Sequence, residues 1–426
     1  MASRGLWHYM SARTRRGLAL SWSALFVLSL LLQYFSFAVA AQPALAAHNE
    51  GIFELDGNAL DQAAAGADWQ NGAEGSADQF FVGASGEDPA NDVGYFTTGG
   101  SKDENDIPKW EITDNSVPDK NELLDAYAAV YQSGGDTWVY FGADRFDNDG
   151  DAQIGFWFFQ NNIGIANGDF TGVHADGDVL ILSEYTNGGV VDLVCAYEWD
   201  GSGGGSNIAN PGSCDPATAG SNLNLVAAGA ACDTADGTYN ICAVTNAAVS
   251  TAPWPFTNKD GAHDFGVGQF FEGGINLSDM FGGQPPCFGT FLAETRSSQE
   301  TDAQLKDFAL GSLSTCVPPT IATQVDDATA DFGQQVTDTA TLSGSQGPVT
   351  GTVSFFICTP AQITAAGCPT GGTQVGGAVT IVAGSATSAA YTVGLTAAAA
   401  GTYCWRAEYT PAASSDYLAA THTNNS

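Results

Sequence analysis

The feature that most limits the fold of this chain is a series of short apolar runs separated by turn-forming residues. The chain contains 52 glycines, and Thr, Ser, Asn and Asp fill most of the intervals between the runs. Runs of this length bounded by such residues are typical of β-strands. The clearest candidates are Val139–Phe141, Ile154–Phe159, Val179–Leu182, Val190–Tyr197 and Gly289–Ala293. The pattern therefore predicts an all-β protein.

One of these runs indicates how the strands are covered. In Ile154–Phe159 the residues on both alternating faces are apolar, which is typical of a strand buried on both sides, as in the centre of a sandwich. The segment Asn121–Tyr131 is ambiguous, because its apolar residues fit a helix and a strand equally well.

Two adjacent prolines, Pro318 and Pro319, mark the predicted domain boundary, because proline cannot donate a sheet hydrogen bond. We expect a large N-terminal β-sandwich over 48–316, a linker over 317–320 and an immunoglobulin-like sandwich over 321–426. In the last segment, apolar and polar residues alternate over 336–342, 353–357 and 403–409. The Tyr-x-Cys corner of antibody domains is absent, since Tyr403 directly precedes Cys404.

The N-terminus has the composition of a signal peptide, which we assign to residues 1–47. Basic residues precede an apolar run from Gly17 to Ala41, and two Ala-x-Ala sites follow at Ala38–Ala40 and Ala44–Ala46. An uncleaved anchor is the alternative, because about 25 apolar residues are long enough to span a bilayer. If the signal peptide is cleaved, we expect a secreted or cell-surface protein.

The charge balance excludes some partners. The chain has 47 acidic and 12 basic residues, and four of the basic ones are arginines of the leader, so the mature chain carries 39 more acids than bases. Such a surface repels nucleic acid and anionic lipid and attracts cations. We therefore expect no nucleic-acid partner, and contact with a membrane only through an uncleaved leader.

The chain has nine cysteines, which in an exported protein predict disulfides. Nearest-neighbour pairing gives Cys195–Cys214, Cys232–Cys242, Cys287–Cys316 and Cys358–Cys368, although sequence alone does not fix connectivity. Cys404 remains unpaired. Either its partner lies beyond Ser426, in a sandwich truncated at its last strand, or the thiol is free by design. The Gly- and Ala-rich stretch 201–250 is expected to be a loop pinned by disulfides.

The densest acidic cluster is a candidate cation site. Asp144, Asp147, Asp149 and Asp151 surround Gly150, and Asp56 lies in a second acidic group. Calcium prefers several oxygen ligands of this kind, so Ca²⁺ is the one cofactor that the sequence suggests. The spacing does not match an EF-hand, and a polar hairpin turn explains the same residues.

Three tryptophans near predicted loops, Trp110, Trp138 and Trp254, are candidate platforms for sugar rings, with core packing as the alternative. No catalytic residues are predicted, because no known nucleophile, metalloprotease or phosphate-binding motif occurs. Glu272 and Glu294 lie in apolar surroundings, where burial would raise their pKa values. Pairing with Arg296 or Lys306 is the alternative for these two acids.

Several segments of the mature chain resemble a group of exported actinobacterial surface or adhesin-like proteins, in which a β-sandwich is followed by bacterial immunoglobulin-like repeats. The segments that carry this resemblance are 53–58, 100–103, 118–120, 126–128, 150–159, 271–276, 294–298 and 401–406. The resemblance implies this architecture more than any activity. The N-terminal part is also weakly similar to jelly-roll, DOMON and carbohydrate-binding sandwiches.

The sequence thus supports three hypotheses for function. The first is a non-enzymatic secreted or surface protein whose N-terminal sandwich binds an extracellular ligand, such as a glycan or a neighbouring cell surface, with cation assistance, and whose immunoglobulin-like module is a spacer. The second is a purely structural stalk or coat protein. The third is a secreted glycan-active hydrolase.

Overall fold

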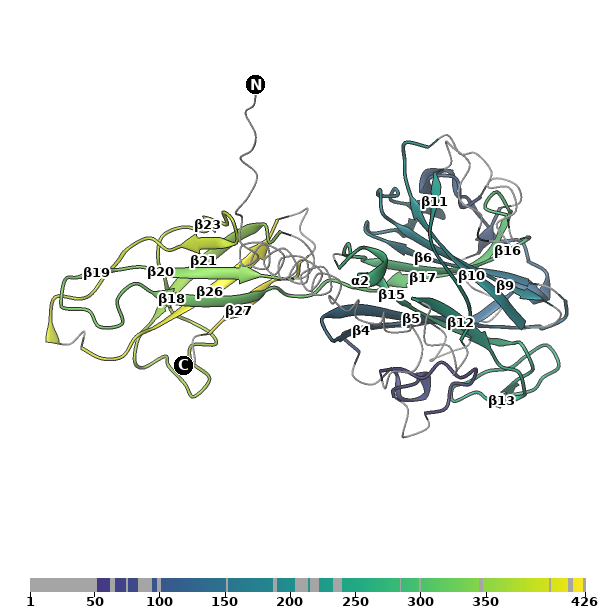
Figure 1. The fold of residues 1–426 in the computed structure, drawn as a ribbon, viewed down its shortest axis with the longest axis horizontal. Helices are drawn as coiled ribbons and strands as arrows, with labels where there is room; N and C mark the ends of the chain where they lie inside the picture. The colour runs from purple at the N-terminus through teal and green to yellow at the C-terminus, as the bar shows by residue number, and fades with distance from the viewer. Residues whose placement is uncertain are drawn as a thin grey trace, which may run out of the picture. The chain divides into compact units, whose positions relative to one another are not determined.

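The computed structural model describes residues 52–61, 66–73, 76–82, 94–97, 101–150, 152–186, 190–203, 214, 222–232, 240–283, 285–298, 300–344, 348–397, 400–412 and 417–423. The expected signal peptide (1–47) and Asp151 lie outside these residues. The described chain is almost entirely β, as the sequence predicted, and its strands form two sandwiches (Figure 1).

The main strands of the N-terminal sandwich form one eleven-stranded sheet. In sheet order they are β1 (Asp78–Val82), β4 (Leu123–Ser133), β5 (Asp136–Arg145), β15 (Phe270–Asn276), β12 (Ile241–Thr245), β11 (Leu223–Ala231), β10 (Val190–Trp199), β9 (Val179–Thr186), β6 (Ala152–Phe159), β16 (Thr290–Arg296) and β17 (Leu305–Ser312). All five strands proposed from the sequence are present. The ambiguous segment 121–131 is strand β4 from Leu123 onward.

The sheet folds over itself where the parallel strands β11 and β12 meet over only two residue pairs. Its two halves face each other across a core that includes Phe141 of β5, Phe156 and Phe158 of β6, Phe271 of β15 and Phe291 of β16. Side chains in a strand point alternately to opposite faces. Each half therefore has a second face, directed away from the central core, that other segments must cover.

Irregular segments cover both outward faces. One half is covered by residues from 53–73 and 256–265, and the other by residues from 96–110 and 163–170. Strand β6 is consequently buried along its whole length, with Phe156 in the central core and Trp157 in an outer one. This arrangement explains why Ile154–Phe159 is apolar on both faces.

The shorter elements of this sandwich lie mostly in the covering segments. They are η1 (Trp69–Asn71), β2 (Tyr95–Phe96), η2 (Ile107–Lys109), β3 (Ile112–Thr113), η3 (Asp119–Asn121), β7 (Gly164–Ala166), β8 (Asp169–Thr171), β13 (Ser250–Thr251), β14 (Asp264–Phe265) and α2 (Leu277–Met280).

The prediction that 201–250 is a disulfide-pinned loop is wrong for its described residues 222–232 and 240–245, which contain β11 and β12. In β11 the run of Ala and Gly residues gave a weak strand pattern, because both have low β propensity. A Cβ atom at Gly229 would lie 1.9 Å from the carbonyl oxygen of Ile241. The close approach of the two backbones thus requires glycine at this position.

The C-terminal sandwich consists of two main sheets packed around one core. One sheet has the order β18 (Thr320–Val325), β20 (Asp338–Ser343), β24 (Ser385–Thr387). The other contains β22 (Thr373–Gln374), β21 (Gly351–Cys358), β26 (Cys404–Pro411) and β27 (Ala420–His422), with β23 (Val379–Thr380) also on β21. A small third pair joins β19 (Gln335–Val336) to β25 (Tyr391–Thr392).

This order matches the two sheets of an immunoglobulin-like sandwich. Strand β27 pairs with β26 at the edge of the second sheet. Val317, placed in the predicted linker, pairs with Tyr417 and so belongs to this sandwich.

The structure contains four disulfides, which join the nearest-neighbour pairs Cys195–Cys214, Cys232–Cys242, Cys287–Cys316 and Cys358–Cys368. Cys404 is a half-buried free thiol, and it lies opposite Cys358 in the β21–β26 register. Four disulfides indicate an oxidising environment, such as the cell exterior. None of the described helices is long and apolar enough to cross a membrane.

Candidate functional site

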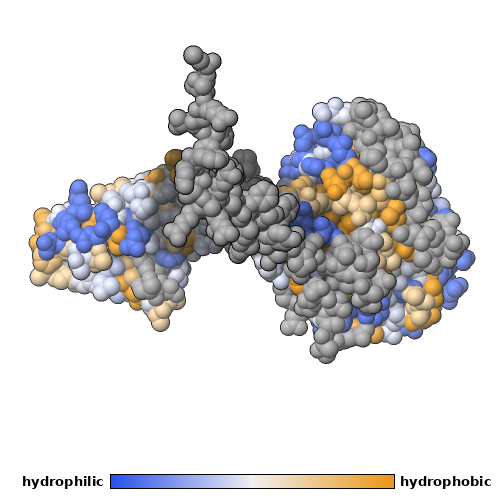
Figure 2. Space-filling model, viewed as in Figure 1, coloured by the Kyte–Doolittle hydropathy of each residue, from blue (hydrophilic) through white to orange (hydrophobic). Residues whose placement is uncertain are grey.

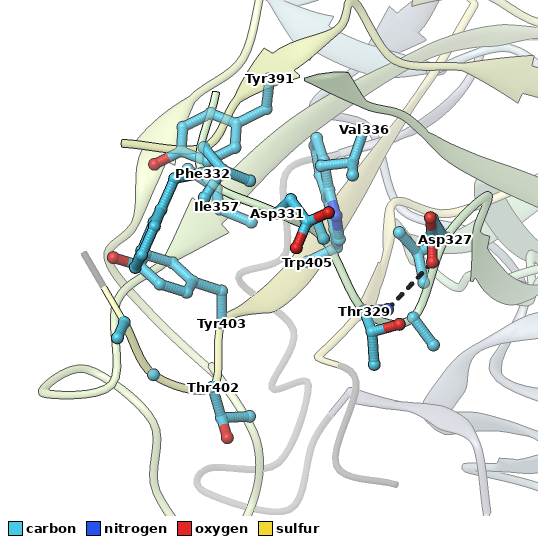
Figure 3. A pocket seen from close by; sticks show the side chains of 16 residues that line it. Asp327, Thr329, Asp331, Phe332, Val336, Ile357, Tyr391, Thr402, Tyr403 and Trp405 are labelled. Carbon is cyan, nitrogen blue, oxygen red and sulfur yellow. Dashed lines mark hydrogen bonds between the residues drawn. The ribbon is translucent and has the colours of Figure 1, made fainter. Parts of the chain in front are cut away.

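The best candidate site is a pocket of about 580 Å³ at one end of the C-terminal sandwich (Figure 3). Its floor is formed by Val336, Ile357 and Trp405, which are core residues of β19, β21 and β26. Its walls come from the loop between β18 and β19, from Tyr391 and Val393 in and after β25, and from residues 400–403 just before β26. The pocket therefore forms where the apolar core opens to solvent.

Side-chain hydrogen bonds hold the wall between β18 and β19 in place. The Oδ1 atom of Asp327 accepts from the Thr329 N–H at 3.1 Å, and its Oδ2 accepts from Gln334 Nε2 at 2.8 Å. Gln334 Oε1 accepts from the Asp331 N–H at 2.9 Å. Backbone hydrogen bonds from this loop to Val393 then attach it to the chain after β25.

Four aromatic side chains line the pocket. Tyr391 lies opposite Val336 in the β19–β25 pair, and its ring centroid is 6.5 Å from that of Tyr403 and 6.4 Å from that of Trp405. Phe332 is 52% exposed, so an apolar ring is left at the pocket mouth. Figure 2 shows hydrophobic residues interspersed with hydrophilic ones on the visible face of each sandwich.

The polar side chains of the pocket are acids and hydroxyls. Asp327, Asp331, Thr329 and Thr402 line it, and the described lining includes no Lys, Arg or His. The only Lys or Arg in the sequence 317–426 is Arg406. Arg406 is already occupied, because it pairs with Glu408, donates to the Gly371 carbonyl and lies over the ring of Phe356.

Pockets of this size that combine apolar walls with polar groups are typical of small-ligand sites. This pocket was not predicted from the sequence. The alternation near Val336, Ile357 and Trp405 correctly placed these residues on strand faces, but it gave no sign that the core opens beside them. One feature of the sequence could have indicated the site. Two acids and an aromatic residue, Asp327, Asp331 and Phe332, fall in one short segment.

The three tryptophans proposed as sugar platforms are buried or half-buried. Trp110 and Trp138 are 2% and 1% exposed, so neither ring offers a face to a ligand, and that assignment is wrong. Both belong to the outer cores that cover the sheet. Trp254 is half-buried, and its indole N–H donates to Asp144 at 3.3 Å.

Three of the acids proposed as a cation site, Asp144, Asp147 and Asp56, contact other groups of the chain. Asp144 is still a residue of strand β5, so its buried carboxylate faces Trp254 and the N–H of Asp125 rather than the turn. Burial and the neighbouring Asp125 raise the pKa of Asp144 well above its usual range.

Two other acids of the proposed cation site, Asp147 and Asp56, also contact groups of the chain. Asp147 binds the Lys259 ammonium at 2.6 Å and accepts from the Asp149 N–H. Asp56 is exposed and accepts from Asn58. The described residues include no group of three or more His, Cys, Asp or Glu side chains placed to hold a metal ion.

Glu272 and Asp68 form a buried acidic pair in the N-terminal sandwich. Glu272 Oε1 accepts from the N–H groups of Asp56 and Gly57 at 2.9 and 2.8 Å, and Oε2 accepts from Trp69 Nε1 at 3.0 Å. Burial and Asp68 raise the pKa of Glu272 well above its usual range. Burial, with the acids Asp56, Glu54 and Asp61, raises the pKa of Asp68 to about 8. Glu272 therefore pairs with donors of the chain and not with a base.

Glu294 lies in a second buried group with Asp103 and Arg296. Arg296 Nη2 binds Asp103 Oδ2 at 2.7 Å, and Trp157 Nε1 donates to Asp103 Oδ1 at 2.8 Å. Burial and the charge of Asp103 raise the pKa of Glu294, against a smaller lowering by Arg296. The strongest partner of Arg296 is thus Asp103. Glu272 and Glu294 both have 0% exposure.

His174 is enclosed among aromatic rings. Its Nδ1 is 3.1 Å from Asp178 Oδ2, and its ring stacks on Trp199 with a centroid distance of 4.0 Å. Its side chain and that of Asp178 have no exposed surface. The pair resembles part of a catalytic dyad, but its burial makes it a packing element.

No protein-family model matches this chain, and a search of curated proteins found no similar sequence. The resemblance to exported surface proteins with immunoglobulin-like repeats therefore remains a hypothesis.

Proposed function

We propose that this chain is an exported, non-enzymatic binding protein in which the C-terminal sandwich holds the ligand and the N-terminal sandwich is a rigid support. The observation that carries the proposal is the open pocket with its aromatic walls, Tyr391 and Tyr403, over the floor residue Trp405. The sequence suggested the opposite assignment, with the ligand on the N-terminal sandwich. Burial of Trp110 and Trp138 removes two of the three tryptophans proposed for that assignment, and the third, Trp254, is half-buried.

Two further observations support the proposal. The four disulfides suit a protein that works outside the cytosol, in keeping with the expected signal peptide. Glu272 and Glu294, the acids considered for glycan hydrolysis, have no surface that a substrate could reach. General acid–base catalysis requires contact between the acid and the reacting group.

The test is a ligand screen against the full chain by saturation-transfer NMR, with neutral sugars, amines and carboxylates, with and without calcium. Thr402→Trp places a large ring at the pocket wall, and Thr380→Trp makes the same change at an exposed position of β23 outside the pocket. We expect the first variant to lose the ligand and the second to keep it.

A ligand that binds both variants equally would place the site elsewhere and favour the N-terminal sandwich. If no class of ligand binds the folded wild-type chain, the structural stalk or coat becomes the better hypothesis.

A further inference from the structure

We infer that the pocket of the C-terminal sandwich takes an alkylammonium group, either of a free amine or of a lysine side chain. This inference rests on the proposed function, and it names the ligand class of the same site. It follows from the charge of the pocket, from the hydrogen-bonding types of its side chains and from its aromatic walls.

The charge of the sandwich favours a cation. Residues 317–426 contain six acids and one arginine, and that arginine is bound to Glu408 and to the Gly371 carbonyl. No described residue binds the carboxylate of Asp331 through a hydrogen bond or an ion pair. In the view of Figure 3 this carboxylate lies between the ring of Trp405 and the rings of Phe332 and Tyr403. Asp331 is exposed to solvent, so an ammonium group would replace water at this carboxylate with a charge-assisted hydrogen bond.

The side chains that line the pocket favour an amine over a sugar or an anion as the ligand. A site for an anion needs Lys, Arg or several backbone N–H donors, and the described lining has none of these basic side chains. Sugar hydroxyls both donate and accept, so a sugar site usually combines carboxylate acceptors with strong donors such as amides, Lys or Arg. Here the strong polar groups, Asp327 and Asp331, only accept when ionised.

The aromatic residues suit both the cationic end and the apolar stem of an alkylamine. Ammonium groups are attracted to the faces of Trp, Tyr and Phe rings within about 6 Å. The methylene stem of an alkylamine would contact the exposed ring of Phe332 and the floor residues Val336 and Ile357. An acidic group beside several rings is therefore complementary to an apolar stem that ends in a cation.

The experiment follows the Trp405 indole resonance of the labelled full chain by NMR during titration. The probes are n-butylammonium, 1,5-diaminopentane and N-acetyl-lysine methylamide, with n-butanol, butyrate and maltose as neutral and anionic controls. We expect only the amines to shift this resonance, and 0.5 M NaCl to weaken their binding. Tighter binding of the lysine derivative than of the free amines would assign the ligand to a polypeptide, and the reverse order to a free amine.

Asp331→Asn removes one charge and keeps the size of the side chain. Because hydrogen bonds to charged groups contribute strongly, we expect it to weaken amine binding about tenfold or more. Tyr403→Ala should weaken binding about threefold or more through loss of an aromatic face. The matched control, Asp169→Asn, removes the same charge from an exposed position of β8 in the N-terminal sandwich and should leave the affinity within about twofold.

Two results would contradict the inference in distinguishable ways. If maltose or butyrate shifts the Trp405 resonance and Asp331→Asn does not matter, the pocket binds a ligand of another class and the proposed function survives. If no probe shifts it in the folded chain, and no ligand is found in the wider screen, the proposed function fails as well.

Discussion

At the scale of single residues, the buried acids show how a chain with few bases tolerates carboxylates in its core. Arg296 is bound to Asp103, and Glu272 and Asp68 have no basic partner among the described residues. Removing a carboxylate from water disfavours its charged form, so these groups keep their protons at higher pH. Glu272 is stabilised instead by backbone and indole N–H donors.

Asp68→Asn tests this account. The variant keeps an oxygen that can accept from the Trp69 N–H and removes the titrating group. The pKa of Asp68 is about 8 in the folded chain and about 4 when unfolded, so between these values the folded state holds one more proton. Stability from this residue therefore falls as pH rises through that window. Wild type should lose stability between pH 5 and pH 8. We expect this loss in unfolding free energy to be about 1–3 kcal/mol smaller in the variant.

The measurement is the free energy of unfolding from urea titrations at both pH values. Asp169→Asn, at an exposed position, serves as the control and should show the wild-type pH dependence. An unchanged pH dependence in Asp68→Asn would show that Asp68 is already ionised at pH 5.

At the scale of elements, the junction of β11 and β12 determines the architecture of the N-terminal sandwich. These strands join the two halves of the sheet, and the Cys232–Cys242 disulfide ties the end of β11 to β12. Strand β12 is mostly buried, whereas β11 alternates buried or half-buried residues with exposed ones, so pairing with neighbouring strands, more than propensity, makes β11 a strand. The Ala- and Gly-rich end of β11 permits the two backbones to approach closely at Gly229.

Gly229→Ala should therefore destabilise the N-terminal sandwich by about 2 kcal/mol or more. The new methyl group would overlap the backbone carbonyl of Ile241, which cannot move without disturbing β12. Thermal unfolding followed by tryptophan fluorescence measures the effect. Gly289→Ala is the matched control, since its added Cβ would lie at an ordinary 3.6 Å from the Gln160 carbonyl oxygen. Equal melting temperatures for the two variants would contradict the close packing of this junction.

At the scale of the whole molecule, charge links stability to pH. The pKa values of Asp68, Asp144, Glu272 and Glu294 are all raised by burial, and that of Asp338 is raised to about 6. Each of these acids binds its proton more tightly in the folded state than in the unfolded chain. The large excess of acids over bases adds surface repulsion that also grows with pH.

We accordingly expect the stability of the full chain to be greatest in mild acid and to fall steadily from about pH 5 to pH 9. Urea denaturation across this range measures the slope. Adding 0.5 M NaCl should reduce only the surface part, because buried groups are screened much less. A stability that rises toward pH 8 would contradict protonation of the buried acids.

Much of the fold could be predicted from the sequence. The strands Val139–Phe141 and Ile154–Phe159 follow from apolar patterning, and the second sandwich follows from alternation near Val353 and Trp405. The candidate site could not be predicted in this way. Trp110 and Asp144 were plausible surface residues by local sequence, but the covering segments bury one and the continuing strand β5 buries the other.

The sequence by itself therefore determined the all-β class, the two sandwiches and the acidic character, because alternation and composition act locally and directly. Only the tertiary structure decided which aromatic rings and carboxylates face solvent. Exposure depends on segments distant in the chain that cover each face of a sheet. That is why the pocket at Phe332, Tyr403 and Trp405 is open while Trp110 and Trp138 are closed.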